Sequence, residues 1–184
     1  MKLEFIYDMC AKIAVITNSA RKPGVAAMLG ELRSYSLLTR AALSAAEANA
    51  FDHGNGAFFL DPGPVRAIKN LMPGWMQRAS EIVIRLGSHN LLCTPASGLL
   101  DDPEVGALLE KYLPGANDVG ARERIRVFRT AWDLVGSALG SRVALYERYY
   151  LASQETNFIL EARIAAKERG EDSLRAFFEE IDSS

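Results

Sequence analysis

The sequence predicts an all-α fold, a bundle of helices packed around one core. Apolar residues recur at steps of three and four over most of the 184 residues, whereas the alternation typical of a strand never persists. No strand–helix alternation of the kind that builds a parallel sheet is present. Hydrophobic residues make up 49% of the chain and charged residues 24%, which is ordinary for one globular domain. We therefore expect a single helical domain over residues 1–184, with residues 152–184 as a C-terminal helical appendage.

Two helices are expected in the first fifty residues. Residues 2–18 are apolar on most sides, so this helix should lie centrally or at an interface. A second helix follows to about Ala50, with an apolar stripe and then a run of alanines that lets neighbouring helices pack closely. The stretch 51–63 contains three glycines and one proline, so we expect a loop there.

The third helix begins at Pro64, a residue that suits the first turn, and ends at Gly87. Pro73 lies inside it and predicts a kink or a fresh start. Residues 88–101 should be irregular, and a short helix capped at Asp102 should follow.

The clearest helical periodicity runs from about residue 119 to residue 151. If unbroken, this helix is about 45 Å long, a length typical of bundles. Two more helices are expected over 156–169 and 172–181.

Glycines inside the long helical stretch indicate a close approach to its backbone. Gly136 and Gly140 each cost about 1 kcal/mol in a helix interior, so something should pack tightly against them. A neighbouring helix is one candidate, and the edge or phosphate of a cofactor is the other. Tyr146, Tyr149 and Tyr150 follow, and we expect them to anchor the core or an interface.

Charge and composition exclude several classes of protein. A net charge of −2 gives no field suited to a phosphate backbone, so we expect no nucleic-acid partner. Cys10 and Cys93 are too few for a disulfide framework, which favours a reducing compartment and a cytoplasmic location. No run reaches the roughly 18 apolar residues of a membrane helix.

The common catalytic and metal-binding motifs are absent from the sequence. We find no glycine-rich phosphate loop, no HExxH, no CxxC and no GxSxG. The two histidines, His53 and His89, stand 36 positions apart in expected loops, and as metal ligands they would need further partners from elsewhere.

Three segments nevertheless resemble a known family. Residues 122–136 read RERIRVFRTAWDLVG, with GSR at 140–142 and LYER at 145–148. This stretch is similar to the C-terminal domain of the 4-hydroxyphenylacetate 3-monooxygenase oxygenase family. KLEF at 2–5 and LLEKYLPGAN at 108–117 agree with it, so the resemblance covers nearly the whole chain.

The resemblance implies a helical bundle like the C-terminal domain of acyl-CoA dehydrogenases, assembling into a dimer or tetramer. Family members use reduced FAD supplied by a separate flavin reductase, and with O2 they hydroxylate a phenol beside its hydroxyl group. Their N-terminal helical domain and β-domain hold most of the flavin-binding and phenol-binding side chains, and this sequence matches neither. We therefore expect an oligomer-forming, flavin-covering part of such an enzyme that is inactive alone and contributes no catalytic residue.

The resemblance also implies where a flavin would be contacted. In related folds the loop after the third long helix reaches the flavin, and here that loop reads Leu86-Gly87-Ser88-His89-Asn90 where the family carries a Gly-Gly-Ser-Gly-like run. The candidate contacts are hydrogen-bond donors and one cation, from this loop and from a later corner: Ser88, Asn90, Thr94, Gly140, Ser141 and Arg142.

A second branch of the superfamily, 4-hydroxybutyryl-CoA dehydratase, binds an iron–sulfur cluster through a pattern like HxxxYxxCK near the start of this domain. Tyr7 and Cys10 fit that pattern, but Leu3 stands at the histidine position and Lys12 is displaced by one. We therefore expect no cluster.

Two other hypotheses remain open at this point. One is a non-enzymatic helical interaction module that kept the bundle and lost the cofactor, which the bulkier residues His89 and Asn90 favour. The other is one chain of a split oxygenase, with a complementary oxygenase chain that supplies the remaining domains.

Overall fold

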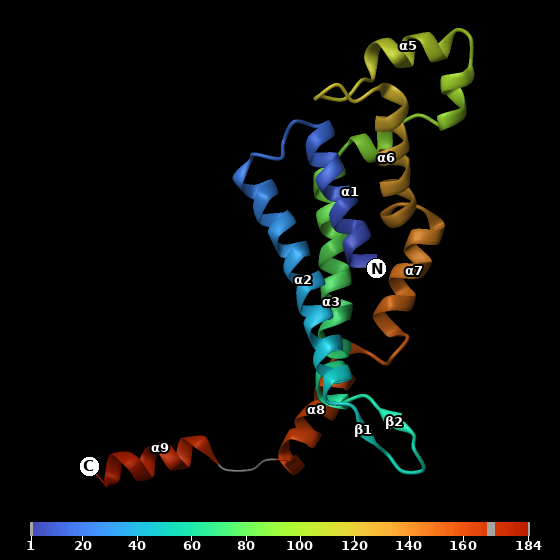
Figure 1. Ribbon diagram of the computed structural model, residues 1–184. Coiled ribbons are helices and arrows are strands. Elements are labelled where there is room, and N and C mark those ends of the chain that lie inside the picture. Colours follow the sequence, from blue (N-terminus) through green and yellow to red (C-terminus); the bar gives the residue numbers. More distant parts are fainter. Residues whose placement is uncertain (1, 169–171, 184) are drawn as a thin grey trace.

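The protein is a helical bundle, as the sequence predicts (Figure 1). The computed structural model describes residues 2–168 and 172–183. In chain order the elements are α1 (Lys2–Ile16), α2 (Pro23–Ala48), β1 (Phe51–Asp52), β2 (Phe58–Phe59), α3 (Pro62–Gly87), α4 (Asn90–Cys93), the 3-10 helix η1 (Ser97–Asp101), α5 (Val105–Tyr112), α6 (Ala121–Val135), α7 (Ala138–Tyr149), α8 (Gln154–Glu168) and α9 (Ser173–Asp182). No helix among the described residues is both long and apolar enough to cross a bilayer.

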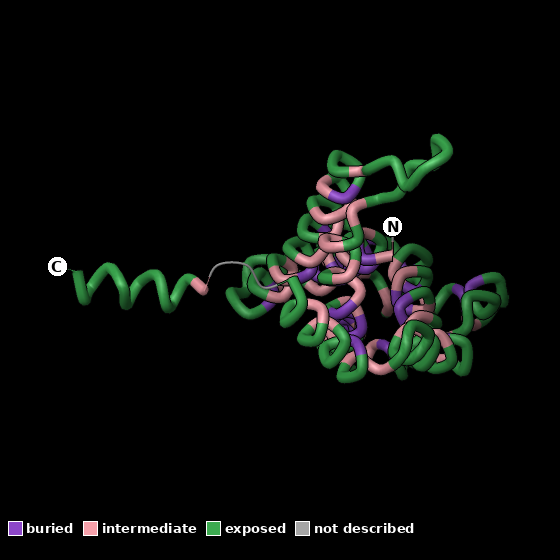
Figure 2. Tube along the Cα trace, turned by 90° about the horizontal axis from the view of Figure 1, so that it is seen from below, coloured by how far each residue is buried: buried purple, intermediate pink, exposed green. Residues whose placement is uncertain are grey.

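Helix α1 lies at the centre of the bundle, as its apolar sequence predicts. It packs against α2, α3 and α6, and Ile6, Cys10 and Ile13 are fully buried on it. Ile82 of α3 and Phe128 of α6 complete this core. Figure 2 shows the buried residues in purple, where the helices of the bundle face one another. Each such aliphatic or aromatic side chain contributes about 1.5–3 kcal/mol on burial, so α1 is the element that holds the others together.

Helix α3 is continuous from Pro62 to Gly87, so the fresh start expected at Pro73 is wrong. Proline removes one backbone hydrogen bond, but Pro73 is buried among neighbouring helices, and this packing keeps the helix in register. Asp61 caps the start by accepting a hydrogen bond from the Gly63 N–H at 2.9 Å. The predicted end at Gly87 is confirmed: a Cβ there would lie 2.6 Å from Cγ of Leu91, which packs over it.

The segment 51–63 is not wholly a loop, because it contains a short antiparallel hairpin. Phe51 pairs with Phe59 and Asp52 with Phe58. The turn between them places Gly54, Asn55 and Gly56 at positive φ, a conformation that glycine and asparagine adopt most readily. Each strand is two residues long, too short for an alternating pattern to predict it.

The long helix expected over 119–151 is broken into α6 and α7. The Ser137 side chain caps α7 by accepting a hydrogen bond from the Gly140 N–H at 3.0 Å, so the chain turns at Gly136 and Ser137. The close approach expected at Gly140 comes from the end of α6 itself, since an added Cβ would lie 2.5 Å from the Leu134 carbonyl oxygen and 2.7 Å from that of Asp133.

The two C-terminal helices, α8 and α9, differ in how they contact the bundle. Helix α8 is fastened to α3, because Gln154 Nε2 donates to the Asn70 carbonyl at 2.9 Å and Arg66 forms an ion pair with Glu161 at 3.3 Å. Helix α9 extends away from the rest of the molecule in both views (Figures 1 and 2).

Candidate functional site

The structure places three of the predicted flavin contacts together, in the turn between α3 and η1. Ser88 ends α3 at φ 49°, and its carbonyl accepts a hydrogen bond from the Leu91 N–H at 3.2 Å. Thr94 Oγ1 donates to the Asn90 carbonyl at 2.5 Å. The Asn90 Oδ1 accepts a hydrogen bond from Arg124 Nη2 at 2.8 Å, so only the Nδ2 group of this amide is left to donate to a ligand.

The other three predicted contacts form the first turn of α7. Gly140 is buried against the end of α6, while Ser141 and Arg142 are exposed. The Ser141 N–H donates to the Ser137 carbonyl at 3.0 Å, which leaves the Ser141 hydroxyl available. Among the residues that the structure describes, Arg142 pairs with no carboxylate, so its guanidinium can bind an anion.

These two groups lie at opposite ends of α6 and are not in contact. Asn90 is held by Arg124 near the start of that helix, whereas Gly140 packs on Leu134 at its end. Ten residues of helix separate these two points, a rise of about 15 Å. Only an extended ligand could touch both.

A cavity of about 510 Å³ lies between α3 and α7, next to the second group. Its volume is in the range of small-molecule sites. The lining combines hydrogen-bonding and charged side chains with an apolar wall, formed by Gln77, Ser80, Glu81 and Ile84 of α3 and by Ser141, Leu145 and Arg148 of α7. Of the predicted contacts, Ser141 reaches this cavity, while Gly140 and Arg142 flank it in the sequence.

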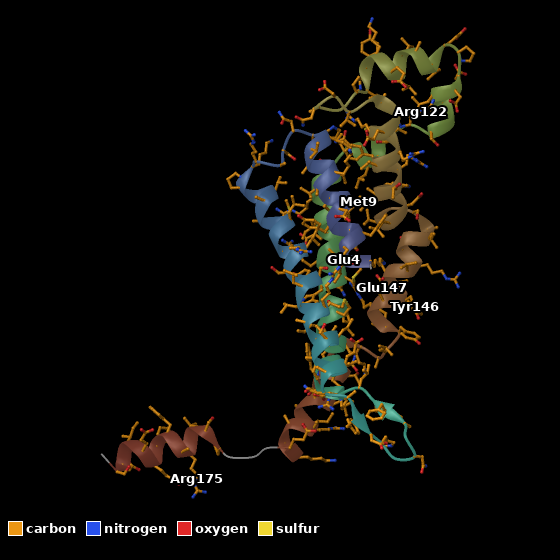
Figure 3. All side chains as sticks on the ribbon, in the orientation of Figure 1. Glu4, Met9, Arg122, Tyr146, Glu147 and Arg175 are labelled. Atoms are coloured by element: carbon orange, nitrogen blue, oxygen red, sulfur yellow. The ribbon has the colours of Figure 1, made fainter. Side chains whose placement is uncertain are left out.

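A second cavity, of about 440 Å³, is bordered by α1, α2, α3, α7 and the start of α8. Tyr146 and Tyr150 stack at its edge with ring centroids 4.6 Å apart. Lys2 of α1 pairs with Glu147 of α7, and Glu4 with Arg40 of α2; Figure 3 shows Glu4, Tyr146 and Glu147 in this region. Tyr146 and Tyr150 are both more than half exposed, so they do not lie in the core of this chain, and their role as interface anchors stays a prediction. Their spacing of four residues predicts that they share one face of the helix.

A polar cluster that the sequence does not predict joins α2 to α3. Arg78 donates to both carboxylate oxygens of Glu31, at 2.9 and 3.0 Å, and the Tyr35 hydroxyl donates to Glu31 at 2.5 Å. The Arg78 guanidinium, followed by the Tyr35 hydroxyl, lowers the pKa of Glu31. Tyr35 also stacks on Trp75 with centroids 4.9 Å apart. This arrangement fastens two helices, and no fixed sequence spacing announces a contact between residues so far apart.

The described part of the chain contains no group of three or more histidine, cysteine or acidic side chains able to hold a metal ion. Cys10, which fits the iron–sulfur pattern, is fully buried on α1. Burial raises the pKa of its thiol to about 12, so the thiolate that a metal would require is disfavoured. His53 lies in the hairpin before α3 and His89 directly after its end, so the 26-residue helix separates the two histidines.

Comparison with known proteins decides the family. Residues 1–179 match the family model described as HpaB, 4-hydroxyphenylacetate 3-hydroxylase C terminal. The chain belongs to this family. A 4-hydroxyphenylacetate 3-monooxygenase oxygenase component of Thermus thermophilus is 32% identical over 83% of the chain and 31% of its own length. A (3S)-3-amino-3-(3-chloro-4-hydroxyphenyl)propanoyl-[peptidyl-carrier protein SgcC2] monooxygenase of Streptomyces globisporus is 36% identical over 86% of the chain and 30% of its own length.

Solved structures of the family have the same fold. The oxygenase component of 4-hydroxyphenylacetate 3-monooxygenase complexed with FAD superposes on 99% of this chain with a TM-score of 0.91 and 29% identity. The match covers 38% of that protein, so the chain spans about a third of the length of its relatives. An archaeal 4-hydroxybutyryl-CoA dehydratase shares the fold with a TM-score of 0.77 at 17% identity.

Proposed function

We propose that this chain serves as the C-terminal, flavin-covering and oligomer-forming domain of a two-component, FADH2-dependent aromatic monooxygenase of the 4-hydroxyphenylacetate type. The observation that carries the proposal is the match of residues 1–179 to the C-terminal family model, together with the TM-score of 0.91 to an oxygenase component complexed with FAD. A related structure holds both FAD and 4-hydroxyphenylacetate, which supports a phenol as the class of substrate.

We infer that side chains around the α3–α7 cavity contact one edge of a flavin. The Ser141 hydroxyl can donate to a ring carbonyl, while the Ser80 hydroxyl, which donates to the Met76 carbonyl at 3.0 Å, can accept a hydrogen bond from a ring N–H. The guanidinium of Arg142, next to Ser141 in the sequence, can pair with a phosphate or an anionic ring. Reduced FAD supplies the oxygen-activating chemistry when it is bound. This chain would contribute binding groups and two apolar side chains at the cavity, Ile84 and Leu145, which are exposed here and would be covered by the ring.

The same proposal names the partners. A separate flavin reductase would supply the reduced cofactor, and homo-oligomer formation would bring each copy beside the flavin of a neighbour. A cytoplasmic location fits the two free cysteines, Cys10 and Cys93.

The alternative, a helical interaction module without cofactor, has one observation in its favour. The side chain of Asn90 is bound to Arg124 and so serves the packing of the turn. This leaves Ser141 and Arg142 as the residues whose substitution separates the two functions.

A chimera provides the test. The corresponding C-terminal part of the Thermus thermophilus oxygenase component is replaced by this chain, and its affinity for reduced FAD is measured anaerobically. Arg142→Ala should weaken binding about tenfold, the loss expected for one charge-assisted hydrogen bond. Arg163→Ala on α8, which removes another exposed arginine, is the matched control and should leave the affinity unchanged. A chimera with no measurable affinity for reduced FAD would favour the interaction module, whereas equal affinities for Arg142, Arg142→Ala and Arg163→Ala would show that Arg142 does not contact the flavin.

A further inference from the structure

The cavity of about 440 Å³ between α1, α2, α3 and α7 contains a buried hydroxyl, that of Ser36 on α2. We call it the Ser36 cavity. Ser34 and Thr39 on the same helix donate their hydroxyl hydrogens to the carbonyls four residues back, at 2.9 and 2.8 Å. The Ser36 hydroxyl forms no such bond, and it has no other hydrogen-bond partner among residues 2–168 and 172–183.

The Ser36 oxygen is reached from this cavity. In the described part of the chain, no side-chain oxygen that is closed to solvent in a buried or half-buried residue lacks a hydrogen-bond partner. Ser36 is only 4% exposed and lines the cavity, so its Oγ must open into it. Asn157 is equally buried there, but its Nδ2 donates to the Leu151 carbonyl at 2.9 Å. An unpartnered buried hydroxyl costs free energy, which a ligand in the cavity would recover.

The walls of the Ser36 cavity are apolar. They are formed by Leu3 of α1, by Ile68, Met72 and Met76 of α3, and by Leu151 before α8. Methionine side chains are flexible and polarisable, so they adapt to an aliphatic chain or to an aromatic ring. The volume lies within the range of small-molecule sites. The body of the ligand should therefore be apolar and uncharged.

The charges at the border of the cavity favour an anionic ligand. Three cations and two carboxylates line it. Lys2 pairs with Glu147 at 2.5 Å and Arg40 pairs with Glu4; Figure 3 labels Glu4 and Glu147 in this region. Lys69, which is half-buried, pairs with no carboxylate in the part of the chain that the structure describes. One positive charge is thus left over, and it matches a single carboxylate.

The packing of α2 on α3 brings Ser36 and Lys69 to the same part of the cavity. Tyr35 stacks on Trp75 with ring centroids 4.9 Å apart, so the next residue, Ser36, lies opposite the turn of α3 at Pro73. Lys69 is one helical turn from Pro73, a rise of about 6 Å. The long side chain of Lys69 spans such a distance, so one carboxylate can contact both the ammonium and the hydroxyl.

We propose that the Ser36 cavity binds a monocarboxylic acid with an apolar body, whose carboxylate accepts hydrogen bonds from Lys69 and Ser36. The inference goes beyond the flavin-covering function and does not depend on it. None of the six residues predicted to contact flavin lines this cavity, although Met76 borders both this cavity and the α3–α7 cavity.

Isothermal titration calorimetry of the intact chain tests the proposal with four probes. Octanoate and hydrocinnamate are the acids, one with an aliphatic body and one with an aromatic body. Octanamide and hydrocinnamamide are their uncharged counterparts. At least one acid should bind about tenfold more tightly than its amide, because only the acid pairs with Lys69. Either acid would support the proposal, and the one that binds more tightly shows whether the natural body is a chain or a ring.

Two substitutions assign the binding to the proposed residues. Lys69→Met should weaken binding of the acid about tenfold and leave the amide unchanged. Ser36→Ala should weaken the acid about three- to tenfold, the loss of one hydrogen bond. Lys111→Met on α5 and Ser34→Ala on α2 remove exposed residues of the same types, and both controls should leave the affinity unchanged.

Carbon-13 labelling of the methionine methyl groups locates the ligand by NMR. The signals of Met72 and Met76, which line the cavity, should shift on addition of the acid, while those of Met9 and Met28 should not. The proposal is overturned if neither acid binds, or if acid and amide bind equally. It is also overturned if both Lys69→Met and Ser36→Ala leave the affinity unchanged, or if only Met9 or Met28 responds. None of these results would bear on the binding of flavin by the chimera.

Discussion

Arg124 donates from Nη2 to Asn90 Oδ1 at 2.8 Å and from Nη1 to the Pro114 carbonyl at 3.1 Å. One guanidinium therefore ties the start of α6 to two separate turns. We expect Arg124→Ala to lower the free energy of unfolding by about 1–3 kcal/mol, because it removes two charge-assisted hydrogen bonds, of which the one to Asn90 is partly buried. Urea denaturation measures the change. Arg126→Ala, an exposed arginine two residues away, is the control, and equal losses for the two variants would refute the assigned role.

Glycine is required at position 140 because the backbone at the end of α6 lies directly against it in the α6–α7 turn. Gly140→Ala would place a Cβ 2.5 Å from the Leu134 carbonyl oxygen, so it should destabilise the fold by about 1–3 kcal/mol. Gly30→Ala, inside α2, meets nothing within 4 Å and should stabilise by up to about 1 kcal/mol. Thermal unfolding of both variants gives the comparison. A stabilising Gly140→Ala would show that the turn is looser than described.

Phe128 is the largest fully buried side chain and connects α6 to the core around α1. Phe128→Ala should cost about 3–5 kcal/mol through lost burial and the cavity left behind. Phe158→Ala, at 46% exposed, is the matched control and should cost under about 1 kcal/mol. Denaturant titration of the chain distinguishes them, and a small loss for Phe128→Ala would contradict the described core.

The free energy of unfolding should fall as the pH rises above 9, because of Cys10. Burial raises its thiol pKa from 9.0 to about 12, so the folded state keeps the proton while the unfolded state ionises above pH 9. The buried thiol of Cys10 therefore makes its full contribution to the free energy of unfolding below pH 9, and this contribution is lost progressively as the pH rises toward 12. We expect Cys10→Ala to flatten the pH dependence of the unfolding free energy between pH 8 and about pH 10.5. Cys93→Ala, which removes an exposed cysteine, should leave the slope unchanged.

The free energy of unfolding should also fall as the pH is lowered, because of Glu31. The hydrogen bonds from Arg78 and Tyr35 lower its pKa in the folded state, so its contribution is present above the ordinary carboxyl pKa. That contribution is lost as the pH falls through the lowered value. Glu31→Gln should weaken the acid dependence of unfolding below pH 5, measured by urea titration. An unchanged profile would mean that the Arg78 pair is not kept in solution.

The sequence predicted the bundle well because helical periodicity is a local property. The apolar faces of α1 and Phe128 placed the core correctly, and Gly87 marked the end of α3. The break between α6 and α7 was missed, since serine and glycine are also tolerated inside helices and only the capping bond of Ser137 to the Gly140 N–H reveals the turn. A hairpin with two-residue strands is too short to show a period of two.

The candidate site was harder to predict because its residues meet only in three dimensions. Resemblance indicated Ser141, but the opposite wall of its cavity, formed by Gln77 and Ser80 of α3, depends on how α3 and α7 pack. The contact of Asn90 with a flavin stays a prediction, and the structure adds a partner that the sequence did not indicate, because the Asn90 Oδ1 accepts a hydrogen bond from Arg124, 34 residues along the chain. No local pattern announces such a partner.

The most direct test of the central claim is the yield of hydroxylated phenol per FADH2 oxidised by the Thermus thermophilus chimera with 4-hydroxyphenylacetate. The account predicts that the chimera forms the dihydroxylated product, whereas the same oxygenase component without a C-terminal domain mainly releases hydrogen peroxide. A folded chimera that binds substrate yet oxidises FADH2 without forming product would contradict the assignment of this chain as a flavin-covering domain.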